Sequence, residues 1–443
     1  MTYPVNTQPP SSTALLTDQY ELTMLQASLR SGAAERRAVF EVFARHLPHG
    51  RRYGVVAGTG RLLDAIERFR FTQADLDFLG GAGIVDEPTL AFLESYRFTG
   101  NIWGYSEGDC YFPGSPILVV EGSFAEAVLL ETVALSILNH DCAIASAASR
   151  MVTAAGGRPL IEMGSRRTHE RAAVASARAA YISGFSATSN LQARYEYGVP
   201  STGTSAHAFT LVHDSERHAF TTQLEALGKG TTLLVDTYDV PRAVRTAVEV
   251  AGPELGAIRI DSGDLPVLAR QVRELLDELG AVNTRIILTG DLDEFSIAAL
   301  EAQPVDGYGV GTSLVTGSGA PTAALVYKLV ARTSGDNGEL EPVAKRSVGK
   351  PGRGGRKWAV RHRDEHAIAL SERISLSPPE PGPMDRELLV PLVTDGDITG
   401  RASVAEARER HRDSLAELPP YARQLSRGYP AIPTTFEPDG DES

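Results

Sequence analysis

Between residues 159 and 311 the sequence repeats a short apolar run, a polar loop and an amphipathic stretch, and this repeat limits the possible folds more than any other feature. The short runs predict strands, and the stretches with helical spacing predict helices. Parallel strands need a crossover of about a dozen residues or more, and the intervals here provide it. The repeat therefore favours a parallel α/β barrel over an antiparallel meander. The expected strands are 159–163, 184–188, 199–204, 232–236, 257–261, 285–289 and 307–311, and the expected helices are 169–182, 241–251, 266–279 and 293–302.

The segment before this repeat predicts a separate α+β domain, after a disordered stretch over residues 1–12. Asp18 and Glu21 have the spacing of a capping box at the start of a helix. We place the N-terminal domain at 1–130, the barrel at 131–332 and a C-terminal segment at 333–443, whose last dozen residues are expected to be mobile. Further elements are expected as strands at 37–43, 117–121 and 388–393 and as helices near 58–69, 86–95 and 403–418.

The charge balance excludes some classes of partner. The chain has 43 Lys and Arg against 56 Asp and Glu, a formal net charge of −13, which argues against a general affinity for nucleic acid or an anionic membrane. Residues 1–5 have neither the basic nor the apolar region of a secretory signal. No run approaches the roughly 18 apolar residues of a membrane span. Cys110 and Cys142 lack metal-ligand spacing, so we expect buried thiols and a cytoplasmic protein.

Polar residues follow the expected strands. Because the carboxyl ends of all barrel strands open on one face, side chains distant in sequence can meet there. We therefore expect the active site at this face. The polar residues that follow the strands are Glu162 and Arg166, His207, Asp236 and Tyr238, Asp261 and Asp264, Gly290 and Asp291, and Gly311 and Thr312.

The pair Arg166 and Arg167 has two interpretations. It can be a solvated pair at a helix start, because most charged side chains are exposed. However, Gly164 allows a tight backbone turn after the strand, and a guanidinium matches a carboxylate in a bidentate geometry. Together these features indicate an anion site.

His207 ends a run of small, mostly hydroxylated residues, 201–206, that leaves the imidazole almost unscreened. A single histidine is often structural, yet at a strand end this one can serve as a base, an acid, a metal ligand or a nucleophile. Metal ligation is the weakest of these options, because His213 is the only other histidine within seven residues.

Two further clusters suggest phosphate and metal chemistry. Asp261 or Ser262 can simply cap a helix, but carboxylates at a barrel mouth can also hold Mg²⁺ through water or face a cationic transition state. The glycine turns at 290–291 and 311–312 favour phosphate, and no P-loop motif is present. The basic run 345–357 is either a solvated loop or an attractor of a small polyanion.

In combination, these motifs make the chain resemble the bacterial nicotinate phosphoribosyltransferases, the ATP-coupled salvage enzymes of NAD synthesis. The resemblance covers about residues 15–360 in consistent order, and the glycine-rich segment 349–355 looks looser than the family's compact basic loop. The motifs that carry it are 16–24, 51–54, 111–116, 162–167, 203–207, 234–238, 259–264, 308–312 and 327–329.

The resemblance implies the incomplete α/β barrel of type II phosphoribosyltransferases, packed on an α+β domain that the C-terminal segment completes. It also implies an ATP-dependent enzyme, classed as a carbon–nitrogen ligase, that converts nicotinate and phosphoribosyl pyrophosphate into nicotinate mononucleotide and pyrophosphate. Mg²⁺ is the implied cofactor and ATP a co-substrate. The implied assembly is a homodimer with shared active sites.

The resemblance also assigns roles residue by residue. His207 matches the histidine that ATP phosphorylates, and Arg259 and Asp261 match contacts to phosphoribosyl pyrophosphate, its ribose or magnesium. Phe185 matches an aromatic that stacks on the pyridine ring, and Tyr20 matches a residue that enters the partner subunit's pocket. Gly290, Asp291, Gly311 and Thr312 match the site of the 5′-phosphate, Arg166 and Arg167 lie beside the pyridine carboxylate, and Glu162, Thr204 and Ser205 complete the implied substrate-binding set.

Three alternatives remain open. A nicotinamide-specific enzyme would call for an aspartate just before the histidine motif, where the only acid from 195 to 206 is Glu196. Quinolinate phosphoribosyltransferases are shorter and independent of ATP. A non-catalytic nicotinate-binding homologue would not need the set of His207, Arg259 and Asp261 that is present here.

Overall fold

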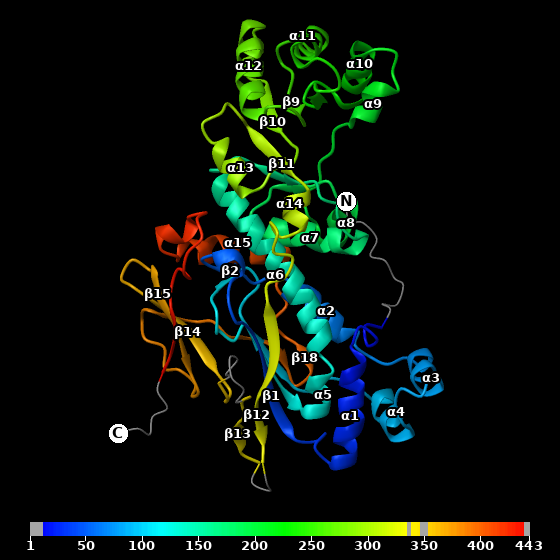
Figure 1. The fold of residues 1–443 in the computed structure, drawn as a ribbon, viewed down its shortest axis with the longest axis vertical. Coiled ribbons are helices and arrows are strands. Elements are labelled where there is room, and N and C mark those ends of the chain that lie inside the picture. Colours follow the sequence, from blue (N-terminus) through cyan, green and yellow to red (C-terminus); the bar gives the residue numbers. More distant parts are fainter. Residues whose placement is uncertain (1–11, 335–337, 346–352, 438–443) are drawn as a thin grey trace. The chain divides into compact units, whose positions relative to one another are not determined.

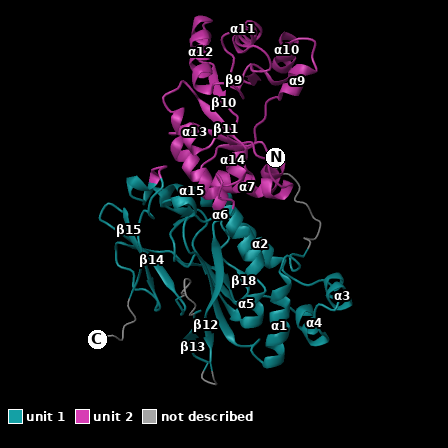
Figure 2. Ribbon diagram, in the orientation of Figure 1, with its two compact units in different colours: residues 1–142, 322–422, 427–443 teal, residues 143–321, 423–426 magenta. Residues whose placement is uncertain are grey.

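The computed structural model describes residues 12–334, 338–345 and 353–437 of the 443-residue chain, and its described residues divide into two compact units (Figure 2). Unit 1 takes its residues from 1–142, 322–422 and 427–443, and unit 2 from 143–321 and 423–426. The long helix α6 (Glu131–Ala154) therefore begins in unit 1 and ends in unit 2.

Unit 2 alternates strands with helices, as the repeat predicted (Figure 1). The helices that cross between its strands bury small apolar side chains, for example Ala243, Val244 and Ala247 of α11. Its elements are β6 (Leu160–Glu162), α7 (Glu170–Ile182), β7 (Ala187–Thr188), α8 (Leu191–Tyr197), α9 (His207–Leu211), α10 (Glu216–Leu227), β8 (Thr232–Leu234), α11 (Val240–Ala251), β9 (Ala257–Ile260), α12 (Leu265–Glu278), β10 (Arg285–Leu288), α13 (Glu294–Ala299), β11 (Gly307–Val310) and α14 (Thr312–Val315).

The strands of unit 2 form one parallel sheet in the order β7-β6-β11-β10-β9-β8. The outer strands β7 and β8 are not paired with each other among the described residues, so the sheet does not close. The predicted incomplete parallel α/β barrel is thereby confirmed.

Two of the predicted strands differ from the structure. The segment 199–204 is not a strand: only Ser201 forms an isolated bridge, to Thr188, because its small polar residues have little to bury. The strand predicted at 184–188 shortens to Ala187–Thr188, because Gly184 adopts a φ of 114° directly after α7. A Cβ at Gly184 would lie 3.0 Å from the Val152 side chain.

Unit 1 contains mainly antiparallel sheets with helices around them (Figure 1). Its main sheet has the strand order β13-β12-β1-β5-β3-β17-β18, and a second sheet has the order β16-β14-β15-β19. Its remaining elements besides α6 are α1 (Gln19–Ser31), β1 (Arg37–Ala44), β2 (Gly54–Val55), α2 (Thr59–Glu67), α3 (Gln73–Gly81), α4 (Glu87–Glu94), β3 (Asn101–Gly104), β4 (Cys110–Tyr111), β5 (Leu118–Ser123), α5 (Phe124–Val128), β12 (Leu325–Thr333), β13 (Leu340–Pro342), β14 (Trp358–Arg363), β15 (Ala369–Ser375), β16 (Asp385–Glu387), β17 (Val390–Thr394), β18 (Asp397–Ile398), α15 (Val404–Ala416) and β19 (Thr434–Phe436), with short 3₁₀ turns at Pro48–Gly50 and Pro420–Arg423.

The capping box predicted at the start of α1 is wrong. Asp18 occupies the N-cap position, but its side chain accepts no capping hydrogen bond. Glu21 is fully buried and instead accepts hydrogen bonds from the backbone N–H and the hydroxyl of Thr132, at the start of α6. A tertiary contact has therefore replaced the local one that the spacing suggested.

The basic run is only partly described, since 346–352 lie outside the described residues, as do 1–11 of the segment expected to be disordered. Lys357 is buried and lies 2.8 Å from Glu41, and Arg356 pairs with Glu121 at 3.0 Å. These two cations therefore hold unit 1 together instead of forming a solvated loop.

Two further expectations concern the tail and the thiols. Part of the tail expected to be mobile, Thr434–Phe436, forms β19, which pairs with β15, and only 438–443 lie outside the described residues. Cys110 and Cys142 form no disulfide and are fully buried, as predicted. Among the described residues, no helix combines the length and the apolar character needed to cross a lipid bilayer.

His411 of α15 is buried at 3% exposure in unit 1, and its Nδ1 lies 3.0 Å from the Gly108 carbonyl oxygen. Burial lowers the pKa of His411 from 6.5 to about 4. The folded state binds a proton on His411 less readily than the unfolded state does. The stability that comes from burying the neutral imidazole is therefore complete above pH 6.5. It is lost as the pH falls towards 4.

We predict that the wild-type protein loses roughly 3 kcal/mol more unfolding free energy between pH 6.5 and pH 4 than His411→Gln does, since each pKa unit corresponds to about 1.4 kcal/mol. Urea unfolding followed by tryptophan fluorescence measures this loss in unit 1, which contains both tryptophans, Trp103 and Trp358. Equal pH dependence in the two proteins would contradict the prediction.

Candidate active site

The carboxyl ends of the parallel strands lie next to one another in unit 2. Val310 of β11 pairs with Glu162 of β6, and Leu288 of β10 pairs with Ile260 of β9. On its other side, β9 pairs with β8. The loops that follow these strands therefore emerge at one edge, where the repeat predicted an active site. These loops carry most of the predicted site residues.

Asp236 joins His207 to the loop after β9. Its side chain is 2% exposed, and Oδ1 lies 3.1 Å from Nε2 of His207. Its Oδ2 accepts hydrogen bonds from the backbone N–H of Asp261 at 3.0 Å and from the Ser262 hydroxyl at 2.6 Å. One buried carboxylate thus orients both the histidine and the aspartate of the predicted site, while His207 itself stays 38% exposed.

Asp261 does not cap α12. The N-cap is Asp264, which accepts a hydrogen bond from the backbone N–H of Val267 at 3.2 Å, so the alternative interpretation of Asp261 or Ser262 as the cap is wrong. Instead, Asp261 accepts a hydrogen bond from the buried hydroxyl of Thr289 at the end of β10. Its carboxylate is therefore held at the strand edge, where it can face a ligand.

Arg259 is a partly buried cation with an unused donor. Its Nη1 donates to the Thr204 hydroxyl at 3.1 Å, and its buried Nε has no hydrogen-bond partner among the described residues. Burial lowers the pKa of Arg259, Asp261 and Asp236 act in the opposite direction, and Arg166 lowers it further. A desolvated guanidinium beside a second cation, with a donor to spare, is suited to binding an anion.

Glu162 shapes the loop that carries Arg166 and Arg167. It is fully buried and accepts hydrogen bonds from the backbone N–H of Gly164 and the hydroxyl of Thr188. Burial raises the pKa of Glu162, and these hydrogen bonds oppose the rise. Its two oxygens are thus engaged within the protein, which favours a positioning role over direct contact with a substrate.

The loop itself is tightly packed against α14. A Cβ at Gly164 would lie 2.2 Å from the Val315 side chain, so only glycine fits there. Arg166 and Arg167 are both exposed in the turn before α7, which begins later at Glu170. They lie just before the helix rather than at its first residue, and their exposure fits both the solvated pair and an open anion site.

The two glycine turns follow the neighbouring strands β10 and β11. Gly290 has a φ of 126°, and a Cβ there would lie 3.0 Å from the carbonyl oxygen of Asp261. Gly311 is the N-cap of α14, and both Asp291 and Thr312 are exposed. The structure thus brings both turns to the same edge as Asp261.

Two predicted residues lie elsewhere. Phe185 precedes β7 and is 1% exposed, so a ligand ring could reach it only after neighbouring side chains move. Tyr20 lies in α1 of unit 1, where it is 45% exposed. Burial, followed by the charge of Glu131, raises the pKa of Tyr20 to about 12.

The site residues predicted from the sequence do not include Asp236. It was recognised as following a strand, but nothing in the sequence indicated that its carboxylate contacts His207. Thr188 and Thr289 were missed for the same reason, because a threonine at the end of a strand is common. The useful signal was the position of all three directly at strand ends.

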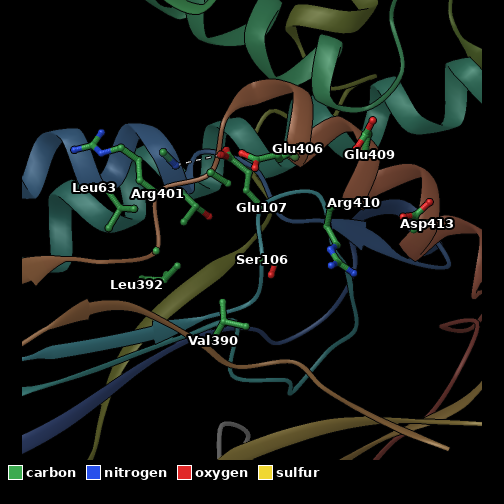
Figure 3. Close-up of a pocket in the computed structure, with 15 residues that line it drawn as sticks. Leu63, Ser106, Glu107, Val390, Leu392, Arg401, Glu406, Glu409, Arg410 and Asp413 are labelled. Carbon is green, nitrogen blue, oxygen red and sulfur yellow. Dashed lines mark hydrogen bonds between the residues drawn. The ribbon is translucent and has the colours of Figure 1, made fainter.

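Two cavities lie in unit 1 and include none of the predicted site residues. One, of about 400 Å³, lies beside α15, and Figure 3 shows Glu107, Arg401 and Arg410 on its walls. Glu107 is engaged there with the N-terminus of α2, through Gly58 and Gly60. The other, of about 240 Å³, is lined by four cations, Arg45, Lys328, Lys345 and Arg353. Since a cavity alone carries no chemistry, the convergent polar groups in unit 2 define the candidate site.

Known proteins resemble the chain over nearly its full length. Residues 15–139 match the family model of the nicotinate phosphoribosyltransferase (NAPRTase) N-terminal domain. The chain is 59% identical over 436 residues to nicotinate phosphoribosyltransferase pncB1 of Mycobacterium tuberculosis, a match that covers 96% of this chain and 95% of that protein. The Bacillus subtilis nicotinate phosphoribosyltransferase is 40% identical over 330 residues, which covers 72% of this chain and 67% of that protein.

Solved structures with a similar fold include a human enzyme. The crystal structure of human nicotinic acid phosphoribosyltransferase superposes with a TM-score of 0.83 at 25% identity. The match covers 96% of this chain and 98% of the human chain, so it extends over both units.

We predict that Arg259→Gln weakens the binding of inorganic pyrophosphate by about tenfold or more, because a hydrogen bond to a charged group contributes about 1.5–3 kcal/mol. Isothermal titration calorimetry measures the dissociation constant. Arg217→Gln is the matched control, since Arg217 is an exposed arginine of unit 2 that pairs with Glu249. Equal affinities for the two variants would show that Arg259 does not bind the anion.

Proposed function

The chain belongs to the nicotinate phosphoribosyltransferase family, and we propose that it joins nicotinate to the ribose of phosphoribosyl pyrophosphate in NAD salvage. The products are nicotinate mononucleotide and pyrophosphate. The observation that carries this proposal is the convergence of His207, Arg259 and Asp261 at one sheet edge, where the buried carboxylate of Asp236 contacts His207 and the backbone N–H of Asp261.

The reaction requires little proton transfer, since the pyridine nitrogen already has a lone pair. The bond between ribose C1 and the pyrophosphate oxygen breaks as the nitrogen bonds to C1, which builds positive charge on the sugar and negative charge on the leaving group. Asp261 supplies a carboxylate that stabilises the positive charge on the sugar. Arg259 supplies a cation that stabilises the negative charge on the pyrophosphate. Positioning and electrostatics therefore supply most of the rate enhancement.

The carboxylate of nicotinate needs a cation that is open to solvent before binding. Arg166 and Arg167 are exposed in a turn that Glu162 and Gly164 hold in place. Their fork of N–H groups matches a carboxylate, which favours nicotinate over nicotinamide.

The two glycine turns, at 290–291 and 311–312, offer backbone N–H groups at the same edge. Both turns come from adjacent strands, and their exposed residues Asp291 and Thr312 leave room for a ligand. We assign them to the 5′-phosphate of the ribose.

We further assign to His207 a covalent role in coupling ATP hydrolysis, which would place the enzyme among the carbon–nitrogen ligases. A ring nitrogen of His207 would attack the γ-phosphorus of ATP, forming a nitrogen–phosphorus bond as ADP leaves. Water would later cleave that bond and release phosphate. The contact with Asp236 supports this role, because a carboxylate stabilises the positive charge that the ring acquires.

Mg²⁺ is the proposed cofactor, and the carboxylates present fit its usual mode of binding. The described residues contain no group of three or more His, Cys, Asp or Glu side chains arranged as a metal site. Mg²⁺ commonly takes only one or two carboxylates and completes its shell with water and substrate phosphates. Asp261 and Asp264 would hold it, and when bound it would neutralise charge on the pyrophosphate.

A homodimer with shared active sites remains the proposed assembly. The exposed face of α1 supports it, since Tyr20 is 45% exposed and Met24, four residues later, is 37% exposed. Leu16, three residues before the helix begins, is 62% exposed, so this region offers exposed apolar side chains to a second copy.

We predict that the purified protein forms nicotinate mononucleotide from nicotinate, phosphoribosyl pyrophosphate and Mg²⁺, and that ATP accelerates the reaction. Chromatographic detection of the nucleotide measures this, and nicotinamide in place of nicotinate should give little product. Preference for nicotinamide would support the amide-specific alternative. Binding of nicotinate without any product would support a non-catalytic homologue.

We predict that His207→Ala abolishes the stimulation by ATP while slow, uncoupled transfer continues, because the substrate-binding groups remain. Parallel measurement of ADP and nicotinate mononucleotide tests this. A variant that still consumes ATP in step with nucleotide formation would exclude His207 as the phosphorylated residue.

A further inference from the structure

A buried ion pair joins α13, the helix that follows the first glycine turn, to the long helix α6. Glu294 is the first residue of α13, four residues after Gly290, and its side chain is 3% exposed. Its Oε1 lies 3.0 Å from Nε of Arg150, a residue of α6 that is 9% exposed. Such a pair is costly to break, because either partner alone would leave a buried charge. Neither residue has a role in the reaction described above.

The second oxygen of Glu294 reaches the turn after α14. Its Oε2 accepts a hydrogen bond from the Ser318 hydroxyl at 2.6 Å. Ser318 has a φ of 51°, in the left-handed region that non-glycine residues rarely adopt, and lies between Gly317 and Gly319, which have positive φ as well. A strained residue of this kind persists only where its surroundings hold it. The hydrogen bond to Glu294 therefore anchors the turn that ends α14.

Arg150 extends the same connection to a third segment. Its Nη2 donates to the carbonyl oxygen of Leu425 at 2.9 Å, and its guanidinium lies 5.8 Å from the ring centre of Phe295. Leu425 belongs to the short C-terminal stretch 423–426 that is part of unit 2. Arg150 thus holds α13 and this stretch together.

Backbone pairing alone does not set the distance between the glycine turns. The pairing of β10 with β11 ends at Leu288 and Tyr308, before Gly290 and Gly311 are reached. The helices that follow, α13 and α14, are only 6 and 4 residues long, so their positions depend on side-chain contacts. Glu294 provides such a contact between them.

We propose that Arg150, Glu294 and Ser318 form a clamp that fixes the spacing of the two glycine turns, so that both fit one phosphate group of the sugar substrate. The three are positioning residues, since they act through the turns and touch no substrate. The identity of that phosphate rests on the proposed function.

The test separates substrate positioning from general stability. We expect Glu294→Gln, Ser318→Ala and Ser318→Gly to raise the KM for phosphoribosyl pyrophosphate. The expected increase is about tenfold for the first two and smaller for Ser318→Gly, because glycine adopts the left-handed conformation without strain. The KM for nicotinate should change by less than about twofold, within the usual scatter of a neutral substitution.

The control is Glu249→Gln, which removes the partner of Arg217 in an exposed ion pair of the same unit and should leave both KM values unchanged. Melting temperatures are measured for all variants. A lower melting temperature with an unchanged KM for phosphoribosyl pyrophosphate would make the clamp purely structural and overturn the proposal. If Glu294→Gln does not fold, Ser318→Gly decides the question, because it removes the anchoring hydroxyl with the least strain.

Calorimetric titration with phosphoribosyl pyrophosphate keeps this test independent of turnover. A wild-type protein that binds the sugar phosphate but forms no nucleotide would refute the proposed function alone. In that case, weaker binding by the clamp variants supports the clamp, and equal binding refutes it.

Discussion

The candidate site depends on one buried carboxylate. Asp236 contacts the ring of His207 with one oxygen and the loop at Asp261 and Ser262 with the other. A buried carboxylate is stable only when its oxygens are satisfied, so the contacts that stabilise Asp236 also fix the groups around it. The same interactions therefore serve the fold and orient the groups that would meet a substrate.

A second buried acid performs a comparable task near the other end of the sheet, in β6. Glu162 holds the Gly164 turn and Thr188, and so shapes the loop of Arg166 and Arg167. Acidic residues inside the protein thus position the loops, while the cations they position remain exposed or partly buried with unused donors. This division suits a site for anionic substrates, because the cations keep their hydrogen-bonding capacity for the ligand.

Unit 1 uses buried charges for a different purpose. Lys357 and Arg356 of the basic run pair with Glu41 and Glu121 inside the unit. The composition of this run suggested either a solvated loop or an attractor of anions, and neither interpretation considered that distant acids could bury the cations. Partners more than 200 residues away in sequence leave no local pattern, so only the folded chain reveals them.

The sequence by itself determined the parallel α/β architecture, the order of its loops and most of the candidate residues, because periodicity and strand-end position are local properties. That the barrel stays open was implied only by the family resemblance. The tertiary structure decided how these residues act. It replaced the expected capping box of Asp18 with a contact from Glu21 to Thr132, removed the strand at 199–204, and brought Asp236 to His207. Buried polar atoms must find hydrogen-bond partners, and in each of these cases the partner comes from a distant part of the chain. The spacing of residues along the chain does not indicate which distant groups become neighbours.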